Sequence, residues 1–169
     1  MGKKVVTVAI MAMLSLFLSK EVMAHCQLPC GIYGDNMRIM SIDEHITTIE
    51  KSMRLIKELQ KNPSENMNQI VRWVNNKENH ADELTDILTY YFMAQRVKIP
   101  EEKSGEAYKK YSTQLELLHG MMISAMKAKQ TTDHKHVEKL RSQLDKFVNA
   151  YFSEEDRMHL QKEHGLGGE

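Results

Sequence analysis

The chain has 169 residues, 41% of them hydrophobic, and it carries 23 basic and 23 acidic side chains, so its formal net charge is zero. This length allows one or two domains, and the apolar content is sufficient for a packed core. Only three Pro and eight Gly occur, which excludes collagen and low-complexity disorder, and the balanced charge without a basic block argues against nucleic acid as a partner.

The first 24 residues have the layout of a secretory signal peptide. Lys3 and Lys4 form a short basic segment, and a 14-residue, largely apolar run follows from Val5 to Leu18. This run is shorter than the ~20 apolar residues that a membrane-spanning helix needs, and Val22 and Ala24 stand at the positions that signal peptidase reads. We expect cleavage after Ala24 and export to the periplasm or the cell exterior, with no stable membrane anchor afterwards. A buried or amphipathic N-terminal helix is the alternative.

Cleavage would leave residues 25–169, with 20 basic and 22 acidic side chains and a net charge of −2. The new N-terminus would be His25, directly followed by Cys26. An amine, an imidazole and a thiol would then stand on two consecutive residues. The small negative charge gives the processed chain no overall attraction for an anionic substrate.

The rest of the chain predicts an all-α fold, an antiparallel up-and-down four-helix bundle over about residues 36–152. No window alternates with a period of two residues, as a half-buried strand would. The connecting segments are short, which favours antiparallel neighbours. Apolar residues instead recur at three- and four-residue steps, and the first such stripe comprises Ile39, Ile42, Ile46, Ile49, Met53 and Ile56.

Three breaks separate the four predicted helices, near residues 62–64, 97–100 and 131–133. The first break predicts Ser64 as the cap of the second helix. The second helix is expected to stop before Pro100, because residues that precede proline avoid the helical region. The tail, residues 153–169, is predicted to fray, and the chain shows neither an internal repeat nor a second domain.

Both cysteines lie at the start of the processed chain, which reads His25-Cys26-Gln27-Leu28-Pro29-Cys30-Gly31-Ile32-Tyr33. The His25 amine and the Cys26 amide nitrogen can close one five-membered chelate ring, and the Cys26 amide and thiolate can close a second. The Cys30 thiolate can fill the fourth corner of a planar site, since Pro29 bends the chain back. The His25 imidazole remains available above or below the plane.

A tetragonal set of nitrogen and sulfur donors suits Ni(II) or Cu(II) rather than tetrahedral zinc. Thiolates reduce Cu(II) readily, which favours nickel. Thiolate and deprotonated amide donors also stabilise a trivalent ion, so the segment indicates one-electron redox chemistry rather than hydrolysis. For the cysteines taken alone, a Cys26–Cys30 disulfide formed in an oxidising compartment is the alternative.

The pattern H-C-x-x-P-C-G-x-Y at a processed N-terminus is similar to the nickel hook of the nickel-containing superoxide dismutases, a family of hexameric four-helix bundles. The resemblance implies one domain over residues 25–169, with the hook at 25–33 and one nickel ion per subunit. It implies that His25 ligates through its amine and imidazole, Cys26 through its amide and thiolate, and Cys30 through its thiolate. Tyr33 matches the tyrosine that lies over the metal, limits access and orders a small anion or water.

Three positions depart from the family pattern. Gln27 stands where some members carry an acidic residue. Met40 stands where some members carry a glutamate that braces the axial imidazole, and His80 stands where an arginine does so. The predicted function is the disproportionation of superoxide to dioxygen and hydrogen peroxide, with nickel alternating between its divalent and trivalent states in a homohexamer. A carrier or sensor that binds nickel or copper through the same hook without turnover is the alternative.

Overall fold

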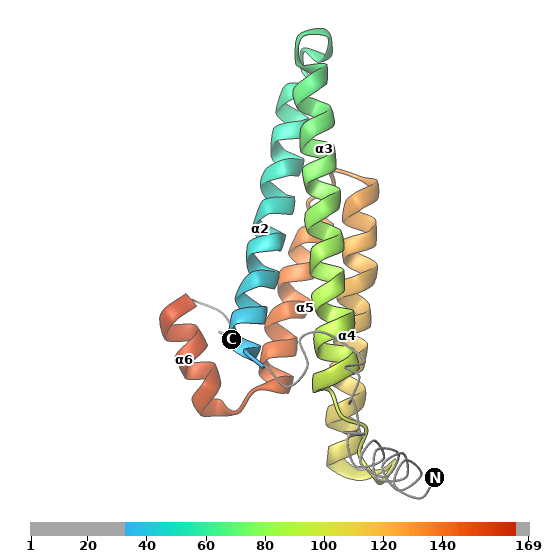
Figure 1. Cartoon of the computed structure of the whole chain (residues 1–169), viewed down its shortest axis with the longest axis vertical. Helices are drawn as coiled ribbons and strands as arrows, with labels where there is room; N and C mark the ends of the chain where they lie inside the picture. Colours follow the sequence, from blue (N-terminus) through green and yellow to red (C-terminus); the bar gives the residue numbers. More distant parts are fainter. Residues whose placement is uncertain (1–32, 165–169) are drawn as a thin grey trace, which may run out of the picture.

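The computed structural model describes residues 33–164, and within this range the chain forms helices and short connections without a strand. Helices α2 to α5 run alternately up and down along the long axis of the molecule (Figure 1). Helix α2 packs on α3 and α4 on α5, while contacts between α3 and α4 and between α2 and α5 close the bundle. The predicted all-α bundle is confirmed, and its elements are α2 (Asp35–Leu59), α3 (Pro63–Asp86), η1 (Ile87–Arg96), α4 (Gly105–Gln130), α5 (Lys135–Tyr151) and α6 (Glu154–His164).

The core lies along the axis of this bundle and is built from the predicted stripes. On α2 every member of the predicted stripe is buried, because the three- and four-residue steps keep those side chains on one helix face. On α5 the predicted stripe is buried except for Tyr151, which is partly exposed, and its buried members are Val137, Leu140, Leu144, Phe147 and Val148. The fully buried side chains include Ile39, Ile42, Ile46, Ile49, Leu84, Leu88, Leu118, Met121, Leu140 and Phe147.

The turn between α2 and α3 differs from the expectation in one detail. Pro63 is the first residue of α3 and Asn62 occupies the N-cap position, so the expected cap at Ser64 is wrong. A proline suits the first helical position because its fixed φ is already helical and its missing N–H would have no partner there. Pro63 therefore begins one helix rather than only ending another.

The second predicted helix ends where expected but is not α-helical throughout. After Asp86 the backbone continues as a π-helix, η1, and ends at Arg96, with Val97 extended. The Val97 N–H donates to the carbonyl of Phe92 at 2.9 Å, which is the i to i−5 pairing of a π-helix. Segments of this kind are rare and occur frequently at functional sites, and η1 supplies two side chains to the site described below.

The predicted frayed tail is wrong for residues 154–164, which form α6. The Ser153 hydroxyl accepts from the Asp156 N–H at 3.2 Å and donates to its carboxylate at 2.6 Å, a capping arrangement that starts the helix. Leu160 is 1% exposed and belongs to the hydrophobic core, so α6 is held by packing as well. None of the described helices combines the length and the apolar character that crossing a bilayer requires.

A buried lysine caps the C-terminus of α4. The Lys77 side chain is 3% exposed, and its Nζ donates to the carbonyls of Ala128, Lys129 and Thr131 at 2.9, 2.5 and 3.1 Å. The last carbonyls of an α-helix have no partner within the helix and carry the negative end of its dipole. Lys77 therefore ties α3 to the C-terminus of α4.

Candidate metal centre

The predicted ligands His25, Cys26 and Cys30 lie outside the described residues, and the described part of the site begins at Tyr33. Tyr33 follows Cys30 by only three residues, and three residues of extended chain span at most about 10–11 Å. The surroundings of Tyr33 are therefore also the surroundings of the C-terminal end of the predicted hook.

Tyr33 packs against two side chains from η1. The guanidinium carbon of Arg96 lies 4.2 Å from the centre of the Tyr33 ring, and the Tyr91 ring meets it edge-on with centroids 6.0 Å apart. A cation is attracted to the electron-rich face of an aromatic ring. Two aromatic rings attract one another when the edge of one meets the face of the other. The Tyr33 side chain is 44% exposed, so one side of the ring is held by the bundle and the rest faces solvent.

Asp35, at the start of α2, is the centre of the hydrogen bonding behind Tyr33. Its carboxylate accepts from Arg96 Nε at 2.9 Å and from Arg96 Nη2 at 2.7 Å, a two-pronged pairing. It also accepts from the hydroxyls of Tyr91 at 2.5 Å and Tyr151 at 2.7 Å. The Tyr91 hydroxyl in turn accepts from the Gly34 N–H at 2.9 Å. The segment that leaves the hook is thus fixed to η1 and α5.

The protonation states of this cluster are set by the same contacts. Burial by itself would raise the pKa of Asp35, but the hydrogen bonds from Arg96, Tyr91 and Tyr151 outweigh it and lower that pKa below its ordinary value of 3.8. Burial and the neighbouring carboxylate raise the pKa of Tyr91 to about 12 and also raise that of Tyr151. At neutral pH Asp35 is therefore charged, and both tyrosines are neutral hydrogen-bond donors.

The π-helical geometry explains how Tyr91 and Arg96 reach the same carboxylate. Residues five apart in an α-helix point about 140° away from one another, since each residue turns the helix by about 100°. The wider turn of η1 pairs residues five apart and brings these two side chains to one side. Below them, the ring of Phe92 meets those of Phe147 and Tyr151 edge-on at 5.1 and 5.5 Å, which holds η1 against α5.

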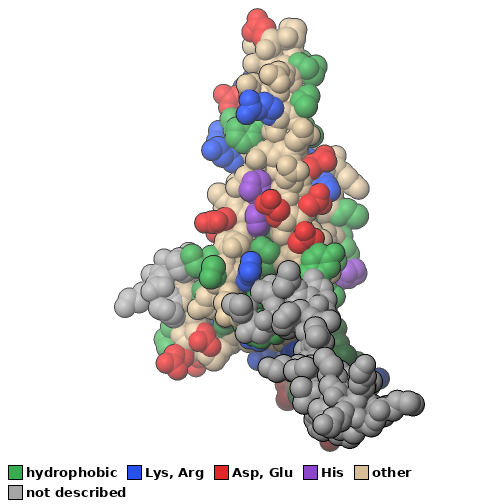
Figure 2. All heavy atoms as spheres, viewed as in Figure 1, with side chains coloured by type: hydrophobic (Ala, Val, Ile, Leu, Met, Phe, Trp, Pro, Cys, Tyr) green, Lys and Arg blue, Asp and Glu red, His purple; other side chains and the backbone are tan. Residues whose placement is uncertain are grey.

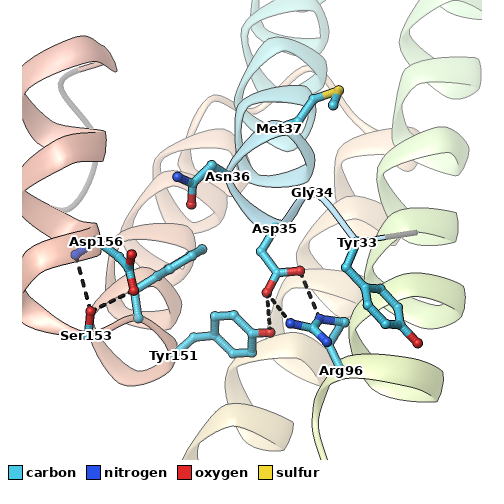
Figure 3. A pocket seen from close by; sticks show the side chains of 10 residues that line it. Tyr33, Gly34, Asp35, Asn36, Met37, Arg96, Tyr151, Ser153 and Asp156 are labelled. Carbon is cyan, nitrogen blue, oxygen red and sulfur yellow. Dashed lines mark hydrogen bonds and ion pairs between the residues drawn. The ribbon is translucent and has the colours of Figure 1, made fainter. Parts of the chain in front are cut away.

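An open cavity of about 630 Å³ lies beside this cluster. Figure 3 shows Tyr33 and Arg96 on one side of it and Ser153 and Asp156, from the start of α6, on the other. The Asp35 carboxylate stands between them. The cavity is large enough for water and small anions, and its lining is formed by Tyr33, Gly34, Asp35, Asn36, Met37, Arg96, Tyr151, Phe152, Ser153 and Asp156.

Two of the positions that depart from the family pattern, Met40 and His80, lie on described helices. Met40 lies half-buried on α2. His80, on α3, packs against His45 of α2 with their Nδ1 atoms 2.8 Å apart, so its imidazole is engaged with α2 within the described part of the chain.

No sequence pattern indicates the Asp35 cluster, although each of its residues is common at its position in a helix. An acidic residue in the first turn of a helix and a basic one in the last turn are common helix-end features. Only the fold joins them, because Asp35 is 56, 61 and 116 residues away from Tyr91, Arg96 and Tyr151.

Comparison with known proteins places the whole arrangement in one family. The family model of the nickel-containing superoxide dismutases matches residues 20–155, which include the predicted hook and helices α2 to α5. No curated protein and no solved structure matches the chain. Because the family match covers most of the sequence and agrees with both the bundle and the hook, the chain belongs to the nickel-containing superoxide dismutases, oxidoreductases that use nickel and act on superoxide.

Proposed function

We propose that the processed N-terminus is the nickel site, with His25, Cys26 and Cys30 as its ligands. Two thiolates and two nitrogens arranged in fused chelate rings fit a tetragonal nickel ion, and both cysteines of the chain lie in this segment. When bound, nickel supplies one-electron chemistry between its divalent and trivalent states, by which one superoxide is oxidised to dioxygen and a second is reduced, with two protons, to hydrogen peroxide.

The observation that supports this proposal most directly is the fixed position of Tyr33. Its ring rests on Arg96 and Tyr91, which are themselves held by Asp35. The bundle therefore holds Tyr33, the last residue of the predicted hook. Tyr33 lines the open cavity, where we propose that it contacts superoxide or water and limits access to the metal.

The decisive experiment measures superoxide consumption by nickel-loaded protein that begins at His25. Tyr33→Phe is the matched variant, because it keeps the ring on Arg96 and removes only the hydroxyl. We expect the variant to retain nickel and to show an altered kcat/KM for superoxide or altered inhibition by small anions. A processed, nickel-loaded wild-type sample without activity would end the proposal.

We further propose that cleavage after Ala24 creates the site. While Ala24 is attached, the His25 nitrogen is a peptide amide, which loses its proton far less readily than a free amine with a reference pKa of about 7.7–8.0. A chain with one extra Met before His25 should fold, as judged by circular dichroism, but lack activity. Full activity from that chain, with its N-terminus verified by mass spectrometry, would show that the amine is not a ligand.

The competing disulfide between Cys26 and Cys30 can be tested directly. Alkylation of the metal-free protein without prior reduction should add two labels if the thiols are free, and intact-mass measurement counts them. An unlabelled chain that gains two labels only after reduction would support the disulfide and contradict thiolate ligation in that sample.

We propose a homohexamer, in keeping with the family. The hairpin of α2 and α3 extends beyond the upper ends of α4 and α5 (Figure 1), and on α3 it carries Met67 and Val71, which are 57% and 50% exposed. Apolar side chains of this size on a projecting hairpin are suited to a subunit contact. Light scattering should give six times the subunit mass, and a monomer at micromolar concentration would contradict the proposal.

A further inference from the structure

Three potential metal ligands meet where the middle of α2 packs on α3. The Nδ1 atoms of His45 and His80 lie 2.8 Å apart, and each lies 3.4 Å from the same carboxylate oxygen, Oε2 of Glu83. The cluster is separate from the hook in sequence, and it contains no sulfur. Figure 2 shows paired histidine side chains with acidic side chains beside them on this face of the molecule.

The fold places these atoms together for simple reasons. His80 and Glu83 are three residues apart on α3 and therefore lie one above the other on one helix face. His45 approaches from α2, the closest packing partner of α3. The side chains of His45 and His80 are 16% and 29% exposed, whereas that of Glu83 is 58% exposed. The two rings are therefore held by packing, and the carboxylate side is open to solvent.

The spacing of the three atoms matches the coordination sphere of a single ion. At metal–ligand distances of about 2.0–2.1 Å, ligand atoms lie about 3.3–3.4 Å apart in a tetrahedron and about 2.8–3.0 Å apart at right angles. The observed separations of 2.8, 3.4 and 3.4 Å cover the same range. All three atoms lie close enough together to be ligands of one cation.

Hydrogen bonding between the two histidines does not give all three atoms a partner. One imidazole can donate its Nδ1 proton to the other, with the tautomers assigned accordingly. The Glu83 oxygen then stays 3.4 Å from both nitrogens, beyond the roughly 2.7–2.9 Å of a charge-assisted hydrogen bond. A cation at the centre would satisfy all three atoms at once.

We propose that His45, His80 and Glu83 form a second metal site, distinct from the nickel hook, for a divalent first-row cation of which Zn²⁺ is the best match. Two imidazoles and one carboxylate are a common zinc ligand set, and three protein ligands leave a position for water on the exposed side. An ion held there joins α2 to α3. It would therefore stabilise the bundle rather than exchange electrons, because no thiolate is present to support a higher oxidation state.

The test uses the full chain with Cys26→Ser and Cys30→Ser, so that the hook thiolates do not take up the probe. Zn²⁺ is titrated in competition with a chromophoric chelator, and we expect one ion per chain and a higher midpoint of thermal unfolding. Glu83→Gln and His80→Gln should each weaken binding by about tenfold or more. His119→Gln, on the exposed face of α4, is the matched control and should bind as the parent does.

A second measurement reports on the ligands themselves. Co²⁺ bound to the parent chain should give ligand-field absorption bands that both site variants lose and that the control keeps. Glu83 is largely exposed, so Glu83→Gln should remain folded, and circular dichroism checks this. If Zn²⁺ does not bind at micromolar concentration, or if Glu83→Gln and His80→Gln bind it as tightly as His119→Gln does, the cluster is only a hydrogen-bonded pair and the proposal fails. The outcome does not depend on whether the hook binds nickel.

Discussion

Arg96 lies with its guanidinium carbon 4.2 Å from the centre of the Tyr33 ring while its nitrogens hold the Asp35 carboxylate. One side chain from the end of η1 thus contacts both the last residue of the predicted hook and the first residue of α2. This double contact joins Tyr33 to the start of α2, and we therefore expect Arg96 to position the predicted hook.

Replacing Arg96 by Met should weaken both the fold and the activity. Asp35 would lose its cationic partner, and because both side chains are partly exposed we expect a loss of about 1–3 kcal/mol in the free energy of unfolding. Arg96→Lys retains the charge but not the two-pronged geometry, so it should rank between the wild type and Arg96→Met. Urea unfolding measures the free energy of unfolding, and kcat/KM for superoxide at matched nickel content measures the activity. Equal activity in all three proteins would refute the positioning role.

Asp35 should make the fold sensitive to acid. Its pKa is lower in the folded chain than in the unfolded one, so its stabilising contribution is complete above the unfolded value of about 3.9 and is lost as the pH falls through the lower folded value. Below about pH 4, the wild type should therefore lose stability more steeply than Asp35→Asn. Urea unfolding across this range tests the difference, and parallel curves for the two proteins would contradict it.

The hook should be separable from the fold. Cys26→Ser and Cys30→Ser should each abolish nickel retention and superoxide consumption, because each removes a proposed thiolate ligand. Neither position belongs to the buried stripes of the described helices, so the helical content should not change. Nickel analysis and circular dichroism on the same samples check both parts, and a collapsed bundle in either variant would show that the hook is needed for folding.

The Lys77 side chain should contribute more to the free energy of unfolding than the nearby Lys129 side chain does. Lys77→Met would leave three carbonyls at the end of α4 without their shared donor. We expect this to lower the free energy of unfolding by about 1–3 kcal/mol. Lys129→Met is the matched control, since Lys129 pairs with Asp82 at the surface and such pairs contribute about 0–1 kcal/mol. Thermal unfolding of both variants makes the comparison, and equal losses would argue against the capping role.

The helices and their buried faces could be predicted because they depend on local periodicity. Ile39, Ile46 and Met53 fall at steps that only one helix face satisfies, and all three are fully buried. The start of α6 was also visible in principle, since Ser153 and Asp156 have the spacing of a capping box. The polar composition of the tail does not by itself favour a packed helix, and the contact that holds α6 is the burial of Leu160.

The cluster behind the hook could not be predicted, because it depends on contacts between distant segments. Nothing near Asp35 in the sequence indicates that Tyr151 will donate to it from another helix. The π-helical turn is equally hidden, since the apolar spacing of Leu88, Tyr91 and Phe92 fits an ordinary α-helix. Long-range packing selects the wider turn, and single-sequence patterns do not record such packing.

The π-helix has a consequence for how the chain can change in length. Removing one residue from the middle of a helix usually rotates everything beyond it out of register. Here, deletion of the exposed Ala94 would leave Tyr91 and the arginine four residues apart, and residues at that spacing share one face of an ordinary α-helix. The shortened segment could return to α-helical hydrogen bonding and still direct both side chains toward Asp35. An inserted residue could not be absorbed by a return to α-helical hydrogen bonding. We therefore expect a one-residue deletion in η1 to be tolerated better than a one-residue insertion.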